Sequence, residues 1–127
     1  MDLYATHNER RIDTDGSFFV GELAIPFGVL NRIFGKPDTA YDADGKTDAH
    51  WSIRFTDGAV CAIYNYKTGR SYLGPSAPAT ADLTHWSVGA HERATYTRLI
   101  RVIEEYQSGA PQMSRHFDSL PSVARIQ

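Results

Sequence analysis

The chain has 127 residues, of which 42% are hydrophobic and 22% are charged. This length and balance predict one folded domain and exclude a wholly disordered chain. Thirteen Lys and Arg are offset by fifteen Asp and Glu, for a net charge of −2, so strong sequence-independent binding to duplex DNA is not expected. Ten of the thirteen cations are arginines, whose planar guanidinium groups suit small phosphate or carboxylate ligands.

The single cysteine, Cys61, excludes an internal disulfide framework and a cysteine-based zinc site. We interpret Cys61 as a small structural residue of a strand. No apolar run approaches the roughly 20 residues of a membrane span, and no basic-then-apolar leader opens the chain. We therefore expect a protein of a reducing, intracellular setting, with no membrane partner.

The first third of the chain predicts a short edge strand, a strand and a helix. The polar residues 1–16 can supply at most one edge strand, and residues 17–25 (SFFVGELAI) are typical of a strand, with Gly21 marking a bulge. A helix is expected over 26–34, because Phe27, Leu30 and Phe34 form an apolar stripe. Gly35 and Pro37 then end that helix.

A β-hairpin is the clearest local signal, over HWSIRFTDGAVCAIYNYK. Asp57-Gly58 between two β-rich runs favours a two-residue type I′ turn, in which Phe55 faces Val60 and Trp51 faces Tyr64. That register predicts a core face made of Trp51, Ile53, Phe55, Val60, Ala62, Tyr64 and Tyr66. It places His50, Ser52, Arg54, Cys61, Ile63 and Asn65 on the other face.

The rest of the chain predicts a long loop over 68–84, a short strand over 85–90 and a second helix over 91–107. We expect an α+β domain over 1–107, with an antiparallel sheet of four or five strands and two helices on one face. Residues 108–127 are expected to form a tail or an arm over a neighbouring subunit.

Metal and catalytic motifs are not evident. The Asp-rich residues 38–48 fail as an EF-hand, because Gly45 as the turn glycine would make Ala40 and Trp51 the first and twelfth ligands. The five histidines include no i, i+4 pair, and the phosphate-binding loop, nucleophile-elbow and dinucleotide motifs are missing. The sequence therefore predicts neither an enzyme nor a cofactor.

Aromatic and cationic residues gather instead around the hairpin exit. Base rings stack on Tyr, Trp and Arg planes, and Lys and Arg donate to phosphates, so this composition favours a nucleotide-sized ligand. Tyr64 and Trp86 fit equally well as core aromatics whose polar tips reach the surface. Arg54 is expected on the opposite face of the hairpin from Tyr64, as a solvated charge or as a group supplied across a subunit contact. The candidate ligand-binding residues are Arg54, Tyr64, Asn65, Tyr66, Lys67, Arg70, His85 and Trp86, with Tyr72 nearby.

Three segments of the chain resemble a widespread family of small tailed-phage proteins: IPFGVLNRIFGKP, DGKTDAHWSIRFTDGAVCAIYNYKTG and HWSVGA. The family pattern is a helix ending in Phe-Gly-x-Pro, a Trp-x-Ile-x-Phe-x-Asp-Gly hairpin with an Ile-Tyr-x-Tyr/Trp-Lys exit, and a Trp-x-Ile/Val-Gly-Gly strand. Ala90 departs from this pattern, since a second glycine is usual there. The resemblance covers residues 17 to 104, and its matching residues are Phe34, Gly35, Pro37, Trp51, Ile53, Phe55, Asp57, Gly58, Ile63, Tyr64, Tyr66, Lys67, Trp86, Val88 and Gly89.

The resemblance implies a phage anti-defence protein acting in the cytoplasm of the infected bacterium. Such a protein binds a cyclic nucleotide signal of bacterial immunity (anti-CBASS) without cleaving it. Sequestration of a cyclic ADP-ribose signal of Thoeris defence is a related possibility. The resemblance also implies a homo-oligomer, a dimer or larger, with ligand pockets near subunit contacts. In this interpretation Tyr64, Tyr66 and Trp86 stack on bases, Lys67, Arg70 and Arg54 neutralise phosphates, and Asn65 or His85 reads a base edge.

Two alternative functions stay open. A small phage protein of this kind could inhibit a host protein by direct contact through a sheet edge or the long loop. A hydrolase of the same signals would need a base, for which His85 or His91 near Asp82 is the local candidate.

Overall fold

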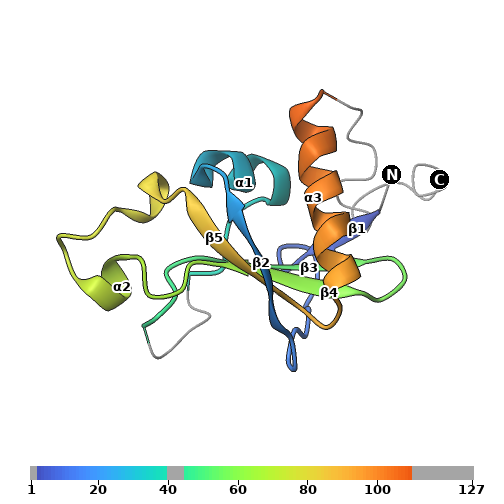
Figure 1. Ribbon diagram of the computed structural model, residues 1–127, viewed down its shortest axis with the longest axis horizontal. Coiled ribbons are helices and arrows are strands. Elements are labelled where there is room, and N and C mark those ends of the chain that lie inside the picture. The colour runs from blue at the N-terminus through green and yellow to red at the C-terminus, as the bar shows by residue number, and fades with distance from the viewer. Residues whose placement is uncertain (1–2, 40–44, 110–127) are drawn as a thin grey trace.

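An antiparallel five-stranded sheet forms the centre of the protein in the computed structural model, which describes residues 3–39 and 45–109 (Figure 1). The strand order is β1-β3-β4-β5-β2, which confirms the expected α+β class. The predicted tail, 108–127, lies mostly outside the described residues. The elements in chain order are β1 (Tyr4–Thr6), β2 (Phe18–Ala24), α1 (Phe27–Phe34), β3 (His50–Phe55), β4 (Val60–Tyr64), α2 (Arg70–Leu73), the 3-10 turn η1 (Thr80–Asp82), β5 (His85–Ala90) and α3 (Arg93–Gln107).

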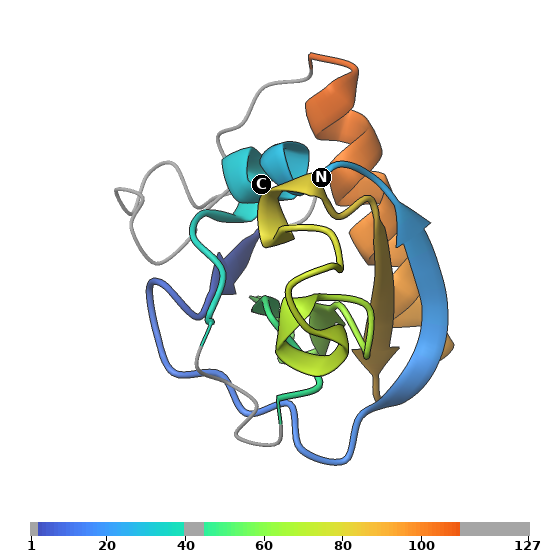
Figure 2. The same cartoon turned by 90° about the vertical axis from the view of Figure 1, so that its left-hand side faces the viewer.

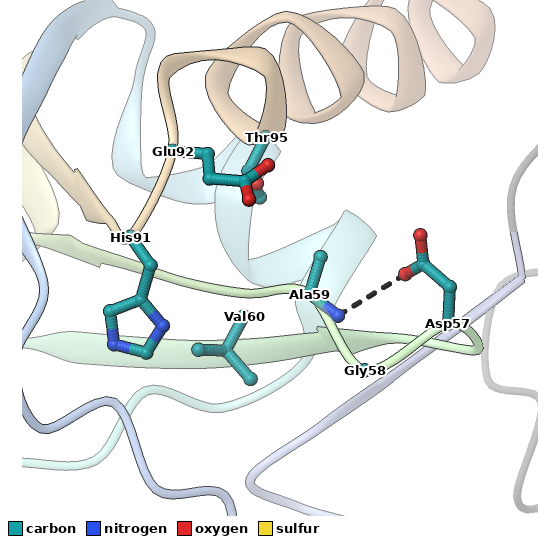
Figure 3. A pocket seen from close by; sticks show the side chains of 7 residues that line it. All are labelled: Asp57, Gly58, Ala59, Val60, His91, Glu92 and Thr95. Atoms are coloured by element: carbon teal, nitrogen blue, oxygen red, sulfur yellow. Dashed lines mark hydrogen bonds between the residues drawn. The ribbon is translucent and has the colours of Figure 1, made fainter.

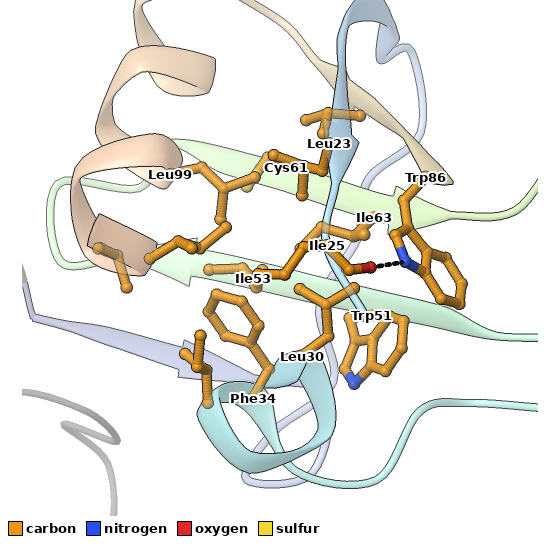
Figure 4. Close-up of a cluster of buried hydrophobic side chains, with 14 of the residues drawn as sticks. Leu23, Ile25, Leu30, Phe34, Trp51, Ile53, Cys61, Ile63, Trp86 and Leu99 are labelled. Atoms are coloured by element: carbon orange, nitrogen blue, oxygen red, sulfur yellow. Dashed lines mark hydrogen bonds between the residues drawn. The ribbon is translucent and has the colours of Figure 1, made fainter. Parts of the chain in front are cut away.

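Both long helices, α1 and α3, cover the same face of the sheet, as the sequence predicts (Figures 1 and 2). We call this the helix face and the opposite one the outer face. The helix stripes pack on alternate residues of the strands, so one continuous apolar core forms between the two layers (Figure 4). Its main members are Leu23, Ile25, Leu30, Ile33, Phe34, Trp51, Ile53, Phe55, Cys61, Ile63, Trp86, Val88, Leu99, Val102 and Ile103.

The hairpin turn has three residues rather than two, which makes the predicted register wrong by one. Phe55 N–H donates to the Ala59 carbonyl at 2.8 Å, and Gly58 N–H donates to the Phe55 carbonyl at 2.9 Å. Gly58 has a φ of +94°, as in a three-residue loop whose glycine adopts a left-handed conformation. Asp57 Oδ1 supports this turn by accepting from Ala59 N–H at 3.1 Å.

The one-residue shift moves every side chain of β4 to the other face. Trp51 now pairs with Ile63 and His50 pairs with Tyr64. Cys61 and Ile63 therefore lie on the helix face, within the core, whereas Val60, Ala62 and Tyr64 lie on the outer face. Arg54 consequently shares a face with Tyr64, contrary to the prediction.

The edge strand β2 contains the predicted bulge, since the pairing with β5 shifts between Phe19 and Gly21. Helix α3 covers the bulge: a Cβ on Gly21 would lie 2.5 Å from the Tyr96 ring. Tyr96 OH donates to the Glu22 carbonyl at 2.6 Å, and Arg93 Nη1 donates to the Val20 carbonyl at 3.3 Å. Two carbonyls of this edge strand are thereby satisfied by α3 side chains.

Two other predicted boundaries change. The second helix begins at Arg93 rather than at 91, because Glu92 has an extended backbone with a φ of −140°. The segment 68–84 is not structureless, since it contains α2 and η1. Helix α1 and strand β5 are confirmed within one residue, and the edge strand expected within residues 1–16 is β1.

Two buried tryptophans fix both ends of α1 to the sheet. Trp86 Nε1 donates to the Ile25 carbonyl just before the helix, at 2.9 Å, and Trp51 Nε1 donates to the Gly35 carbonyl just after it, at 2.8 Å. The two indoles meet edge to face with their centroids 5.2 Å apart. Sheet and helix are thus joined by polar and apolar contacts from the same pair of side chains.

Replacing Trp86 by Phe should lower the free energy of unfolding by about 2–3 kcal/mol, because the buried Ile25 carbonyl loses its donor and the smaller ring leaves a cavity. Urea denaturation followed by circular dichroism measures this loss. The control is Thr97→Ser, at an exposed side chain of α3, where a change within about 0.5 kcal/mol is expected. Equal stabilities of the Trp86 variant and the wild type would contradict the proposed role of the indole.

Candidate functional site

A pocket of about 200 Å³ lies on the outer face, between the sheet and the segment that precedes β2. Its floor comes from β3 and β4, and its walls come from loops at both sides. Hydroxyl groups and rings dominate this lining, which is typical of a site that orients a flat polar ligand. We call it the outer-face pocket, and it is lined by Thr14, Ser17, Thr47, His50, Ala62, Tyr64 and Tyr66.

His50 and Tyr64 form its aromatic floor as a cross-strand pair of β3 and β4. Their rings are stacked, with centroids 6.2 Å apart and an angle of 21° between planes. Gly89, on the neighbouring β5, leaves space beside them, since a Cβ there would lie 3.3 Å from Ser17 Oγ and 3.6 Å from the Tyr64 ring. The pair is therefore held in place by three adjacent strands.

His50 is buried, with an exposed fraction of 3%. Burial lowers its pKa from 6.5 to about 4, and this desolvation effect outweighs the nearby charge of Asp38, which raises the pKa. His7 adds a smaller effect that lowers it further. His50 is therefore neutral at pH 7, and its Nδ1 lies 3.4 Å from Ser52 Oγ. A neutral floor suits an uncharged ring better than a phosphate.

A lysine stands beside the pocket, held between two tyrosines. Lys67 Nζ lies 5.1 Å from the centroid of the Tyr66 ring and 5.3 Å from that of Tyr72. Tyr66 also lines the pocket, so one ring joins the neutral floor to the positive charge. We call Tyr66, Lys67 and Tyr72 the cationic rim.

Asn65 and Asp48 fix the loop that carries the rim. Asn65 Oδ1 accepts from the backbone N–H groups of Asp48 at 2.8 Å and Ala49 at 2.9 Å, and its Nδ2 donates to Asp48 Oδ1 at 3.1 Å. Asp48 Oδ2 in turn accepts from Ser71 N–H of α2 at 3.2 Å. Gly69 is required beside them, because a Cβ there would collide with the Asp48 carboxylate. The start of α2 is thereby attached to the end of β4.

Among the predicted site residues, the structure brings together Tyr64, Tyr66 and Lys67. Trp86 does not fit its predicted stacking role, because it is 2% exposed and lies in the core. The amide of Asn65 is used by the loop contacts described above, so it is not available to read a base edge.

The predicted cations other than Lys67 lie at the margins. Arg70 starts α2 and is exposed, but its Nε donates to the Ala77 carbonyl at 2.9 Å. Arg54 pairs with Val60, four residues along β3 from His50, which places it roughly 13 Å from the pocket floor within one chain. His85 is exposed at the start of β5, with Nδ1 3.0 Å from Thr84 Oγ1.

One of the two residue pairs predicted for a hydrolytic site is separated in the fold. Strand β5 lies between Asp82 and His91, and His91 Nε2 lies 2.7 Å from the Asp15 carbonyl. Over residues 3–39 and 45–109, no three side chains of His, Cys, Asp or Glu are grouped so that they could hold a metal ion. Cys61 is buried, and burial raises the pKa of its thiol to about 12, consistent with a structural residue.

A second pocket, of about 320 Å³, lies between the hairpin turn and the start of α3 (Figure 3). Asp57, His91 and Glu92 supply its titratable groups, and Asp57 pairs with Arg98 at 2.8 Å. Arg98 offsets the charge of Asp57, but the Glu92 carboxylate adds negative charge that disfavours an anionic ligand. Of these two pockets, the outer-face pocket, which no carboxylate lines, is therefore the better candidate for a nucleotide. A larger pocket of about 500 Å³ beside α1 also has no carboxylate, but Phe27 is the one aromatic residue that lines it, so it offers no stacked pair.

Comparison with protein-family models finds no match, and comparison with curated proteins finds no significant relative. Within the described part of the chain, no helix is both long and apolar enough to cross a membrane. The indications of function are the geometry of the pocket and the resemblance of the sequence motifs.

Asn65→Ala should lower the free energy of unfolding by about 2–4 kcal/mol, because two backbone N–H groups at Asp48 and Ala49 lose their acceptor. Asn65→Asp is the matched control, since it keeps an acceptor but places a carboxylate beside Asp48. The control should be more stable near pH 4 than at pH 7 relative to wild type. Urea titrations at both pH values would test this, and an Ala variant as stable as wild type would disprove the role.

The lowered pKa of His50 predicts a loss of stability in mild acid. The unfolded chain binds a proton at His50 near pH 6.5, whereas the folded chain binds it only near pH 4, so the stability present above pH 6.5 falls as the pH drops towards 4. The loss should reach about 3 kcal/mol. His50→Gln should remove this component of the pH dependence in urea titrations. Parallel stability curves for variant and wild type would contradict the assignment.

Proposed function

We propose that this protein binds a cyclic nucleotide immune signal and sequesters it without cleaving it. The observation that supports the proposal best is the outer-face pocket, whose neutral stacked floor of His50 and Tyr64 adjoins the cationic rim at Lys67. A purine or pyrimidine ring stacks on such a floor, and a phosphate attached to it interacts with a lysine. The hydroxyls of Thr14, Ser17 and Thr47 provide donors and acceptors for the edge of a base.

The size of the pocket favours one ring system per chain. At about 200 Å³ it is smaller than the roughly 300–1,000 Å³ of sites that enclose a whole drug-sized ligand. A cyclic dinucleotide carries two bases, so one copy of the protein covers only half of it.

We therefore propose that two copies hold the ligand together, as a dimer or within a larger homo-oligomer. Many cyclic dinucleotides are close to two-fold symmetric, and a two-fold dimer presents the same pocket twice. The rim and the residue next to it expose apolar surface that the second copy can cover: Tyr66, Tyr72 and Leu73 are 49%, 48% and 54% exposed. Arg54 of either copy then belongs to the ligand site only if the contact brings it there.

The motif resemblance supports the biological setting of the proposal. We propose a phage protein that acts in the cytoplasm of the infected bacterium against a cyclic dinucleotide or, alternatively, a cyclic ADP-ribose signal. Sequestration works by stoichiometry, so it requires affinity near the nanomolar range, about −12 kcal/mol. No covalent step and no cofactor is needed for it.

A second candidate function is inhibition of a host protein by direct contact. The exposed pair Phe18 and Phe19 at the start of β2, 54% and 56% exposed, favours it, because adjacent exposed aromatics are common at protein interfaces. This function predicts a stable complex with a host protein and no effect of small molecules.

Thermal unfolding against a panel of cyclic di- and trinucleotides and cyclic ADP-ribose isomers tests the proposal. A ligand at 1,000 times its Kd adds about 4 kcal/mol of stability, which should raise the Tm by more than 10 °C. Heat denaturation of the complex should then release the ligand intact, as chromatography would show. Phe18→Ser is the control and should bind as wild type does.

Two results would oppose the proposal. A panel without any shift would favour the host-protein alternative, and a chemically altered ligand would favour a hydrolase.

A further inference from the structure

Lys67 has a backbone conformation that disfavours any residue with a β-carbon. Its φ is +60°, and it is the one non-glycine residue with positive φ in the described ranges 3–39 and 45–109. Its N–H donates to the Lys46 carbonyl at 2.7 Å, so the chain is held in this turn by a short backbone bond. Glycine would adopt the same turn with less strain.

The side chain of Lys67 is therefore the feature to explain. Its ammonium group lies over the faces of Tyr66 and Tyr72, which orient it without neutralising it. The carboxylate of Asp48, in the neighbouring loop, already accepts hydrogen bonds from Asn65 Nδ2 and from Ser71 N–H. An oriented cation on a strained backbone is typical of a binding group.

Tyr66 fixes where that cation stands relative to the outer-face pocket. The same ring lines the pocket and lies 5.1 Å from Lys67 Nζ. A base on the His50–Tyr64 floor therefore has a cation on the ring that borders the pocket, and a phosphate attached to that base is the group the cation can bind. Arg70, three residues further on, adds exposed positive charge to the same loop.

We propose that Lys67 anchors the phosphate of a nucleotide whose base occupies the outer-face pocket, so that one chain recognises a single nucleoside monophosphate unit. This inference rests on the proposed function and specifies which part of the site binds the base and which part binds the phosphate. The His50–Tyr64 floor takes the uncharged ring, and the cationic rim takes the phosphate. A cyclic dinucleotide then presents one such unit to each of two chains.

Isothermal titration calorimetry of the full chain with adenosine, AMP, guanosine, GMP and a cyclic dinucleotide tests whether Lys67 binds the phosphate. For at least one base, wild type should bind the monophosphate about tenfold or more tightly than the nucleoside. Lys67→Arg should keep that preference. Lys67→Ala and Lys67→Gly should reduce the ratio to about one while leaving nucleoside binding unchanged.

The Tm of the ligand-free variants distinguishes the effect of losing the Lys67 side chain from the effect of the strained backbone. Lys67→Gly relieves the left-handed strain and should raise the Tm by about 3–6 °C, whereas Lys67→Ala keeps the strain and should leave it nearly unchanged. The glycine variant would thus be more stable and bind nucleotide less well. Loss of binding therefore cannot be attributed to unfolding.

The outcomes distinguish this inference from the proposed function. A monophosphate-to-nucleoside ratio that stays high in both Lys67→Ala and Lys67→Gly overturns the inference. Tight binding of the cyclic dinucleotide without any binding of a monophosphate overturns it as well, while the proposed function stands. If wild type binds no nucleotide of either kind, both are overturned.

Discussion

The turn at Gly58 determines which side chains of the hairpin meet the helices and which meet solvent. Because Gly58 adopts a left-handed conformation within a three-residue loop, Cys61 and Ile63 enter the core and Tyr64 leaves it. The same register pairs His50 with Tyr64, and this pair becomes the floor of the outer-face pocket. A two-residue turn would bury Tyr64 and separate it from His50. The core and the pocket therefore both depend on the loop having three residues and not two.

The fold class could be predicted from the sequence because strong periodic signals specify it. Each predicted helix and strand is apolar on one side only, as the stripe of α1, the apolar positions of α3 and the β-rich runs show. Elements of this kind pack into two layers with the apolar sides facing each other. The register could not be predicted, since Asp57-Gly58 is compatible with both loop lengths. The three-residue loop is supported by the Asp57 side chain, which accepts a hydrogen bond from Ala59 N–H.

The candidate site was predictable only in part, for a related reason. Tyr64, Tyr66 and Lys67 are close in sequence, so composition alone indicated them. Thr14, Ser17 and Thr47 carry no signal of their own, because the folded chain brings them to the pocket from separate loops. The two-residue turn predicts His50 on the face opposite Tyr64, whereas the three-residue turn pairs the two residues. Trp86 looked equally suitable for a core or a site, and the acceptor available at the Ile25 carbonyl settles its place in the core.

The covered edge of β2 affects the tendency of this protein to aggregate at high concentration. Unpaired strand edges recruit further strands, and crowded chains with such edges assemble into fibrils. Arg93 and Tyr96 occupy carbonyls along β2, and the opposite edge, β1, is only three residues long. Neither edge strand therefore exposes a long row of unpaired backbone groups to which strands of other molecules can bind. Under the proposed sequestration the protein has to be as abundant as its ligand, and covered sheet borders of this kind favour such accumulation by disfavouring strand-to-strand aggregation.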